Sequence, residues 1–230
     1  MILVTGAGGL VGGALVRTGE VTGLSREALD ITRPEAVTAA LDTLGPTAVI
    51  NAAAQAGVDR ADAEPEWTHA VNGAAPGVLA RACQDRGIRL VHLSTDYVLD
   101  APEVGRLTED LAPNPRSVYA ESKLVGERAV LDAGAVVVRL QWVYQPRQPG
   151  FFTRAIEAMA AGNTVKLVTD QVGCPTPAEV VGPALLKAAR SEATGLFHLA
   201  CRGEATAYEW IARGARQAGV ALQAEAVTRD

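Results

Sequence analysis

Residues 2–13 read ILVTGAGGLVGG, and this stretch decides the fold. The apolar run at 2–5 predicts a strand buried on both faces. A glycine-rich turn follows at once, and the chain then continues into a predicted helix. Gly6, Gly9 and Gly12 fall three residues apart between the two elements. We therefore expect a strand, a tight turn and a helix, with the glycines at the turn.

Further short apolar runs alternate with helix-length segments. Strands are predicted at 2–5, 20–24, 48–51, 89–94 and 135–140, and helices at 34–44, 73–86, 117–133, 151–161, 178–190 and 206–218. Strands that alternate with helices favour right-handed crossovers and a parallel sheet. We expect an α/β protein with a Rossmann-like, doubly wound parallel sheet over 1–145 and a smaller, interleaved mixed α/β region over 146–230.

Composition and charge limit the classes of function. The chain has 230 residues, a formal net charge of -5 and no cluster of Lys and Arg, so the electrostatic footprint of a nucleic-acid binder is missing. Cys83, Cys174 and Cys201 lie far apart, which favours reduced thiols in the cytoplasm over a disulfide framework or a zinc site. No apolar run reaches the roughly 18 residues of a membrane helix. We expect a cytoplasmic protein with a small-molecule substrate and no metal, nucleic acid or membrane partner.

The glycine spacing is typical of a dinucleotide site, where glycines let the backbone approach the pyrophosphate at a helix N-terminus. The alternative is a flexible glycine loop without a ligand. Ser25 and Arg26 stand where an acidic residue usually binds the ribose 2′-hydroxyl. A hydroxyl and a guanidinium suit a 2′-phosphate, which favours NADPH over NADH, although Glu27 next door weakens the argument. The alternative is a solvated turn in which Arg26 contacts nothing.

Asp30 has two interpretations. It is either an adenine contact or the cap of the helix predicted from Pro34.

A second polar pattern ends the predicted strand at 89–94. Residues 91–98 read VHLSTDYV, so an apolar run stops in two hydroxyls, a carboxylate and a phenol. Ligands of an open α/β sheet bind at the carboxyl edge of the strands. Tyr119 and Lys123 are four residues apart, so they share one face of the predicted helix at 117–133. We interpret the strand-end hydroxyls as site residues rather than caps.

Six stretches carry a family resemblance, in the order ILVTGAGGLVG, VINAAAQAGVDRADAEPE, VHLSTDYVLD, YAESKLVGE, VVRLQWVY and DQVGCPTP. Over nearly its whole length the chain resembles the dTDP-4-dehydrorhamnose reductase family of the extended short-chain dehydrogenase/reductase superfamily. The resemblance implies an oxidoreductase that uses NADPH, or NADH, to reduce dTDP-4-dehydro-6-deoxy-L-mannose to dTDP-L-rhamnose. It does not decide the exact sugar nucleotide, a divalent-metal requirement or the oligomeric state. A homodimer is one of the assemblies that it allows.

The resemblance also implies roles for residues. Thr95, Tyr119 and Lys123 form the expected catalytic triad: Tyr119 gives its proton to the ketone, Lys123 lowers the Tyr119 pKa and binds the nicotinamide ribose, and Thr95 donates to the carbonyl oxygen. The expected cofactor contacts are Gly6, Gly9, Leu10, Val11, Gly12, Ser25, Arg26, Asp30, Ile31, Asn51, Ala52, Ala53, Ala54, Asn72, Ser94, Tyr119 and Lys123. The expected substrate contacts are Thr95, Asp96, Tyr97 and Trp142, although Trp142 is equally well explained as a large core side chain.

Some residues distinguish this chain from related proteins that have other activities. Sugar-nucleotide dehydratases of the superfamily carry Asp and Glu after the threonine, whereas here Asp96 is followed by Tyr97, so an elimination lacks its base. Gln141 stands where the family usually has Ser, and Phe151 replaces a common Asn, so the sugar-facing surface is expected to differ. A non-catalytic alternative is an NADP-binding regulatory subunit, similar to the beta subunit of methionine adenosyltransferase, which also keeps YxxxK.

The chain ends at ALQAEAVTRD, before the Arg-Pro segment and final helical stretch that family members carry. We therefore expect the substrate region to be incomplete at its C-terminus and its cleft to be open on one side.

Overall fold

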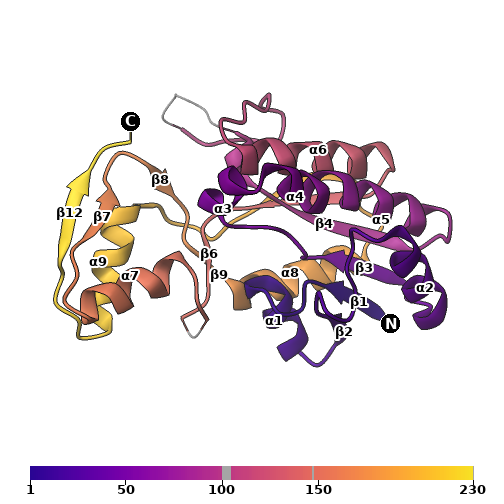
Figure 1. Cartoon of the computed structure of the whole chain (residues 1–230), viewed down its shortest axis with the longest axis horizontal. Coiled ribbons are helices and arrows are strands. Elements are labelled where there is room, and N and C mark those ends of the chain that lie inside the picture. The colour runs from indigo at the N-terminus through magenta and orange to yellow at the C-terminus, as the bar shows by residue number, and fades with distance from the viewer. Residues whose placement is uncertain (100–104, 147, 230) are drawn as a thin grey trace. The chain divides into compact units, whose positions relative to one another are not determined.

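The computed structural model describes residues 1–99, 105–146 and 148–229, and the chain divides into two compact units (Figure 1). The first unit comprises Met1–Leu140 and Gly182–Leu199, and the second comprises Gln141–Val181 and Ala200–Asp230. The chain returns to the first unit because strand β10 (Gly195–Leu199) pairs with β5 (Val136–Leu140) in one sheet. No helix within the described ranges is long and apolar enough to cross a membrane.

Six parallel strands form the sheet of the first unit. Their order is β2-β1-β3-β4-β5-β10, where β1 is Ile2–Thr5, β2 is Val21–Leu24, β3 is Ala48–Asn51 and β4 is Arg89–Thr95. Strands β1, β3 and β5 are buried along their whole length, as strands covered on both faces must be. From β1 the chain adds β2 on one side, and from β3 onward it adds strands on the other side, so the strand order has a switch point between β1 and β3. Ligands of such sheets bind at the carboxyl ends of the strands beside the switch point.

Helices cover both faces of this sheet (Figure 1). Helices α2, α5 and α6 pack side by side on one face together with α3, α4 and the π-helical segment η1, while α1 and α8 lie on the other. Their bounds are α1 Leu10–Arg17, α2 Pro34–Leu44, α3 Val58–Ala63, α4 Pro65–His69, η1 Ala70–Ala74, α5 Ala75–Gln84, α6 Val118–Asp132 and α8 Ala178–Arg190; a 3₁₀ turn, η2, spans Asp96–Val98. The predicted doubly wound parallel sheet is confirmed.

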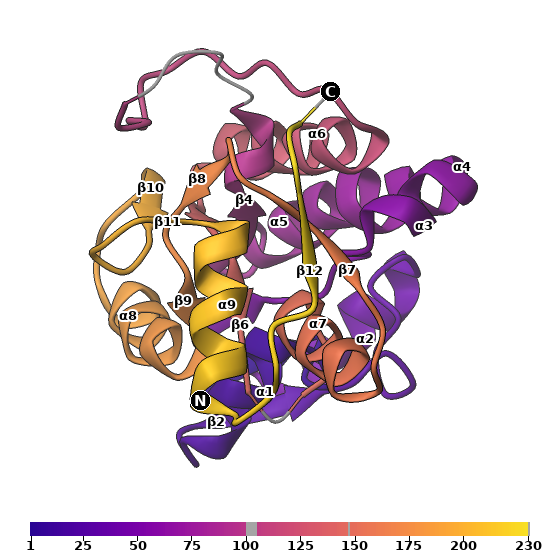
Figure 2. The same ribbon diagram turned by 90° about the vertical axis from the view of Figure 1, so that its left-hand side faces the viewer.

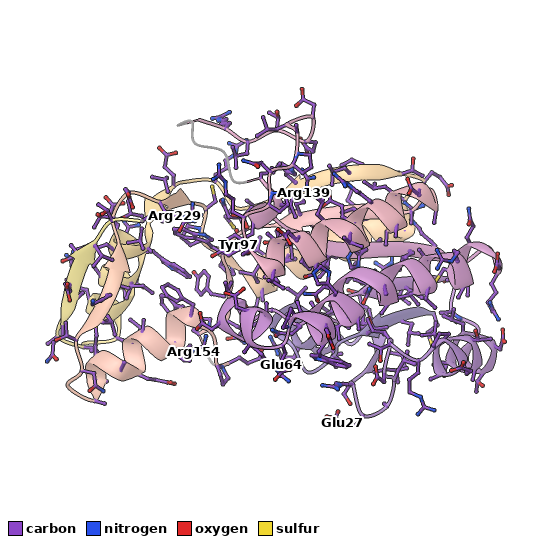
Figure 3. The ribbon with its side chains drawn as sticks, turned by 45° about the horizontal axis from the view of Figure 1, so that its top comes forward. Glu27, Glu64, Tyr97, Arg139, Arg154 and Arg229 are labelled. Atoms are coloured by element: carbon purple, nitrogen blue, oxygen red, sulfur yellow. The ribbon has the colours of Figure 1, made fainter. Side chains whose placement is uncertain are left out.

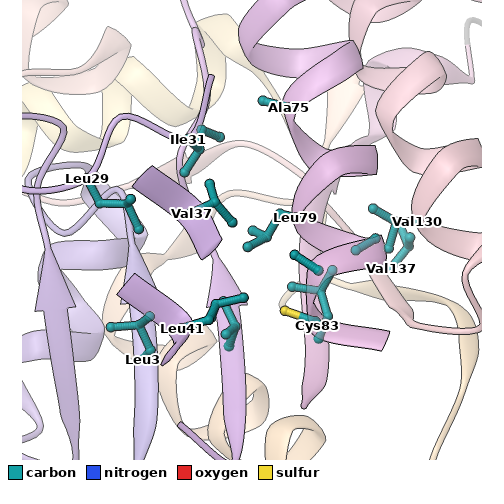
Figure 4. Close-up of a cluster of buried hydrophobic side chains, with 14 residues drawn as sticks. Leu3, Leu29, Ile31, Val37, Leu41, Ala75, Leu79, Cys83, Val130 and Val137 are labelled. Atoms are coloured by element: carbon teal, nitrogen blue, oxygen red, sulfur yellow. The ribbon is translucent and has the colours of Figure 1, made fainter. Parts of the chain in front are cut away.

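The main core lies between the sheet and the α2–α5–α6 layer (Figure 4). Leu3 of β1 and Val137 of β5 are fully buried beneath Val37, Leu41 and Leu79 of the helices. Burying an aliphatic side chain of this size stabilises a fold by about 1.5–3 kcal/mol. This layer therefore fixes the positions of the strand ends that carry the polar residues.

The second unit is small and mixed. Helices α7 (Phe151–Ala160) and α9 (Ala207–Gln217) pack together, and the parallel strands β7 (Val165–Val168) and β12 (Ala224–Val227) lie against them (Figure 2). Met159, Leu167 and Ile211 form the centre of its core. Two short pairs complete it: β6 (Val143–Tyr144) with β9 (Thr176–Pro177), and β8 (Val172–Gly173) with β11 (Ala205–Thr206).

Some elements escaped the sequence analysis. Helix α5 begins two residues later than the predicted helix at 73–86, because the chain enters it through the π-helical segment η1. The short helices α3 and α4 and the edge strand β10 were not predicted. β10 is only partly buried along its length, so it lacks the continuous burial of the central strands.

Candidate active site

The turn between β1 and α1 leaves no room for a side chain at Gly6 or Gly12. Gly6 has a left-handed φ of +70°, and a Cβ there would lie 2.6 Å from the Ala53 Cα. A Cβ at Gly12 would lie 2.2 Å from the Gly6 carbonyl oxygen. At Gly8, in contrast, nothing lies within 4 Å of such an atom. The glycines at positions 6 and 12 are therefore required by backbone contacts.

Helix α1 begins at this turn. Gly9 is its N-cap and donates its N–H to the Gly6 carbonyl over 3.0 Å. The first-turn N–H groups, which include those of Leu10 and Val11, have no acceptor within the helix, and such groups attract anions.

A pocket of about 290 Å³ opens beside the turn, at the carboxyl ends of β1, β2 and β3. The predicted cofactor residues in its lining are Gly6, Gly9, Ser25, Arg26, Asp30, Ile31, Ala52, Ala53 and Ala54. The lining also contains residues that the sequence analysis did not assign to the cofactor, which are Gly8, Glu27, Leu29, Gln55, Arg60, Trp67 and Val71. Nothing local marks Trp67, because only tertiary packing brings α4 to the end of β2.

A larger hollow of about 730 Å³ lies at the opposite edge of the sheet, where its lining includes the strand starts Ile2, Arg89 and Val136. Because ligands of parallel sheets bind at the carboxyl ends, we assign the site to the smaller pocket.

Arg26 has a defined partner. The carbon of its guanidinium lies 4.4 Å from the centroid of the Trp67 ring, a cation–π contact. The alternative in which Arg26 contacts nothing is therefore wrong. Ser25 donates a hydrogen bond of 2.6 Å to the carboxylate of Glu27, labelled in Figure 3, and this bond is the main reason why the Glu27 pKa is lowered.

Asp30 forms a local turn in the lining of the pocket. Its Oδ1 accepts hydrogen bonds from the Thr32 hydroxyl (2.6 Å) and the Thr32 N–H (3.0 Å), and these lower the Asp30 pKa. Helix α2 begins at Pro34 with Arg33 as its N-cap and no side-chain cap. The interpretation of Asp30 as the cap of this helix is therefore wrong.

A chain of buried polar groups runs from β1 to α6. The Thr5 hydroxyl donates to Asn51 Oδ1 over 2.7 Å, and Asn51 Nδ2 lies 3.0 Å from Nδ1 of His92. Nε2 of the same ring lies 3.4 Å from Lys123 Nζ, which donates a hydrogen bond of 2.6 Å to the Leu93 carbonyl. The sequence analysis missed His92, whose position inside an apolar run gave no sign of a polar partner.

Burial determines the charge of this chain of groups. It is the main cause that lowers the His92 pKa well below its usual 6.5, and the charge of Lys123 acts in the same direction. Burial also lowers the pKa of Lys123 to about 8, against the opposing charge of Glu127. The imidazole is therefore neutral at physiological pH.

The two hydroxyls at the end of β4 behave differently. Thr95 Oγ1 accepts the Tyr97 N–H over 3.3 Å and so caps η2, while it also hydrogen-bonds Asp96 (3.2 Å) and the Tyr119 side chain. Thr95 is therefore a cap of η2, contrary to the expectation that it is not a cap, and its assignment as a site residue stays a prediction. Ser94 Oγ is buried and, within the described part of the chain, has no hydrogen-bond partner.

Tyr119 keeps its proton at neutral pH. Burial raises its pKa to about 12, the Thr95 hydrogen bond lowers it, and the charges of Asp96 and Tyr97 raise it. Lys123 was expected to lower this pKa. That expectation is wrong for this structure, because burial dominates and the ammonium is hydrogen-bonded to the Leu93 carbonyl.

Asn72 lies behind the pocket rather than in its lining. It is fully buried in η1, where Oδ1 accepts the Gln55 N–H (2.9 Å) and Nδ2 donates to the Gln55 carbonyl (2.9 Å) and to Ser122 (3.1 Å). It thus ties the loop after β3, with its pocket residue Gln55, to α6.

Trp142 belongs to the second unit. Its φ is +42°, and its ring stacks on Trp210 at a centroid distance of 5.6 Å while covering Gly173. Within the described residues, no group of three or more His, Cys, Asp or Glu is placed to hold a metal ion.

The doubly wound sheet, the glycine turn at its switch point and the adjoining pocket define a Rossmann-like dinucleotide-binding protein. The chain belongs to the family described as the RmlD substrate binding domain, whose sequence pattern matches residues 1–228.

Named relatives and a solved structure are similar over most of the chain. A dTDP-4-dehydrorhamnose reductase of Mycolicibacterium smegmatis is 38% identical over 218 residues, which are 90% of this chain and 66% of the relative. A dTDP-4-keto-6-deoxy-D-glucose reductase of Streptomyces niveus is 36% identical over 90% of this chain and 75% of the relative. The crystal structure of a dTDP-4-dehydrorhamnose reductase from Bacillus anthracis in complex with NADP superposes with a TM-score of 0.92 at 25% identity, covering 99% of this chain and 83% of that one.

Proposed function

We propose that the chain is an NADPH-dependent reductase that converts dTDP-4-dehydrorhamnose to dTDP-L-rhamnose. Membership of the family carries this proposal, since its relatives include reductases of dTDP-linked 4-keto sugars. NADP in the similar Bacillus anthracis structure supports the cofactor. The non-catalytic regulatory subunit is not favoured, because the relatives cited are named as reductases.

The pocket fits a dinucleotide on chemical grounds. Its glycine turn leaves the space that a pyrophosphate needs, as the open surroundings of Gly8 illustrate. Arg26 supplies a cation for a 2′-phosphate. The Ser94 hydroxyl, at the end of β4 and outside the lining of this pocket, has no hydrogen-bond partner among the described residues and can donate to a ligand. We expect these groups, with the first-turn N–H groups of α1, to hold NADPH.

Bound NADPH supplies a hydride to C4 of the sugar. Tyr119, protonated because burial raises its pKa, donates its proton to the ketone oxygen, so that the carbonyl becomes a hydroxyl. Thr95, hydrogen-bonded to Tyr119, orients this oxygen. Lys123, one helical turn from Tyr119, is expected to bind the nicotinamide ribose.

The experiment is a reductase assay followed by the loss of NADPH absorbance. The wild-type protein should oxidise NADPH only when dTDP-4-dehydrorhamnose is present. Tyr119→Phe should lower kcat by at least about 100-fold, the usual contribution of a general acid, and leave NADPH affinity nearly unchanged. NADPH binding without oxidation in the wild-type protein would contradict the proposal.

The division of labour between the units is a further part of the proposal. The first unit binds the dinucleotide, and the second supplies sugar-nucleotide contacts, with Trp142 among them. The protein works in the cytoplasm, as its separated cysteines suggest. A homodimer is the assembly that we propose to test by analytical ultracentrifugation.

A further inference from the structure

His92 is a buried titratable group with no role in the mechanism above. It has no exposed surface and lies on β4 between Asn51 of β3 and Lys123 of α6. A buried imidazole between two polar partners must place its single proton on one side. The position of that proton decides how the ring acts on Lys123.

The side-chain amide of Asn51 fixes this choice. Its Oδ1 accepts the Ala53 N–H over 3.2 Å, and a backbone N–H can only donate. The other end of the amide, Nδ2, therefore faces Nδ1 of His92 and donates to it over 3.0 Å. Since the ring is neutral, a bare Nδ1 means that its proton is on Nε2, which faces Lys123.

This N–H discriminates between the two charge states of Lys123. An ammonium has only donors, whereas a neutral amine has a lone pair that accepts a hydrogen bond. With the Leu93 carbonyl already accepting one proton of Nζ, the Nε2–H of His92 favours the amine and opposes the ammonium.

Other charged and titratable groups around Lys123 act differently. Glu127, one turn further along α6, favours the ammonium but is paired with Arg139 of β5. Tyr119 lies one turn earlier on α6, and Asp96 and Tyr97 of η2 act on its hydroxyl. Segment η1, which packs on the same helix, carries no titratable side chain.

We propose that His92 is a positioning residue that, oriented by Asn51, directs its Nε2–H at Lys123 and so makes Lys123 give up its proton more readily. The proposal deepens the proposed function, on which its catalytic meaning rests, because Lys123 lies one helical turn from the proton donor Tyr119. Its test uses the whole protein without cofactor or substrate, so it does not depend on turnover.

The first measurement reads the proton on the ring directly. The chain has three histidines, His69, His92 and His198, so ¹⁵N spectra of the imidazoles are simple. His198 is an internal reference of the opposite tautomer, since its Nδ1 faces the Leu107 carbonyl (3.1 Å) and its Nε2 faces the Arg139 guanidinium (3.3 Å). His92 should remain the Nε2–H tautomer from pH 6 to 9. An Nδ1–H tautomer at His92 would overturn the proposal.

The second measurement titrates Lys123. The chain has three lysines, and Lys166 and Lys187 are exposed references for ¹³Cε signals. His92→Leu removes the donor and should shift the Lys123 titration upward by roughly half to one pH unit, the size expected for one hydrogen bond. His92→Gln keeps an acceptor for Asn51 and a donor for Lys123 and should shift it less. Equal Lys123 titrations in the wild type, His92→Leu and His92→Gln would overturn the proposal. If the Lys123 titrations shift as expected but the wild-type protein does not reduce the sugar, that result counts only against the proposed function.

Discussion

The guanidinium of Arg26 lies over the ring of Trp67, 4.4 Å from its centroid. Arg26 follows β2 and Trp67 belongs to α4, so the contact joins two segments that line the same pocket. Stacking uses the flat face of the guanidinium and leaves the N–H groups at its edge directed outward for a phosphate. The pair therefore presents a cation whose position is already fixed before a 2′-phosphate binds.

Replacing Arg26 should separate the two cofactors. Arg26→Ala is expected to weaken NADPH binding by roughly 10- to 100-fold, the effect of a charge-assisted hydrogen bond, and NADH binding hardly at all. Trp67→Leu should weaken NADPH binding by about 2- to 5-fold through the lost cation–π contact, and Trp67→Phe should keep most of the affinity. Isothermal titration with each cofactor measures these effects. Equal losses for NADPH and NADH in Arg26→Ala would contradict the assignment.

The glycine turn offers a matched pair of substitutions. Gly12→Ala places a methyl group 2.2 Å from the Gly6 carbonyl, so the backbone must move, and we expect a loss of about 1–3 kcal/mol in the free energy of unfolding. Gly8→Ala meets nothing within 4 Å and should change it by less than about 0.5 kcal/mol. Urea denaturation followed by circular dichroism compares them. A Gly8→Ala variant as unstable as Gly12→Ala would show that the packing of the turn is not the cause.

The ion pair of Arg139 and Glu127 lies inside the first unit, with 2% of each side chain exposed (Arg139 is labelled in Figure 3). Arg139→Met leaves a buried carboxylate without its partner and should lower the free energy of unfolding by about 3–5 kcal/mol. The double variant Arg139→Met/Glu127→Leu removes both charges and should be more stable than Arg139→Met alone. Urea denaturation of the three proteins tests this order, and a double variant less stable than the single one would refute it.

The sequence predicts those parts of the fold that local patterns encode. The apolar runs at 2–5 and 48–51 and the helical segments at 34–44 and 178–190 correspond to β1, β3, α2 and α8 without a change of bounds. Helix α2 begins with Pro34 and ends before Gly45, α8 follows Pro177, and β1 ends before Gly6. The burial of all four elements is continuous or periodic. The edge strand β10 and the π-helical turn η1 depend on tertiary packing, which a local pattern does not contain.

The same limit applies to the site. The glycine turn and the spacing of Tyr119 and Lys123 are visible in the residues, because each depends on one element. Trp67 and His92 are not, since Trp67 meets Arg26, and His92 meets Asn51, only across different elements. The Tyr119 pKa was predicted in the wrong direction for a related reason: burial, which dominates it, is a property of the folded chain.

The buried amine of Lys123 should make stability depend on pH. Its pKa is lowered from 10.5 to about 8 in the folded protein, so between these values the unfolded chain binds more protons than the folded one. The contribution of Lys123 to the free energy of unfolding therefore rises with pH. Cys83, whose pKa burial raises to about 12, and Tyr119 act in the opposite direction, but they are common to the wild type and to a Lys123→Met variant.

The difference in the free energy of unfolding between the wild type and Lys123→Met isolates the contribution of Lys123. From pH 7 to pH 9 the wild type should gain about 1 kcal/mol in the free energy of unfolding relative to Lys123→Met. Lys187→Met, at an exposed position, is the control for removing one lysine side chain. Urea denaturation at pH 7, 8 and 9 provides the three values for each protein. A constant or falling difference for Lys123→Met would mean that folding does not lower the pKa of the buried lysine.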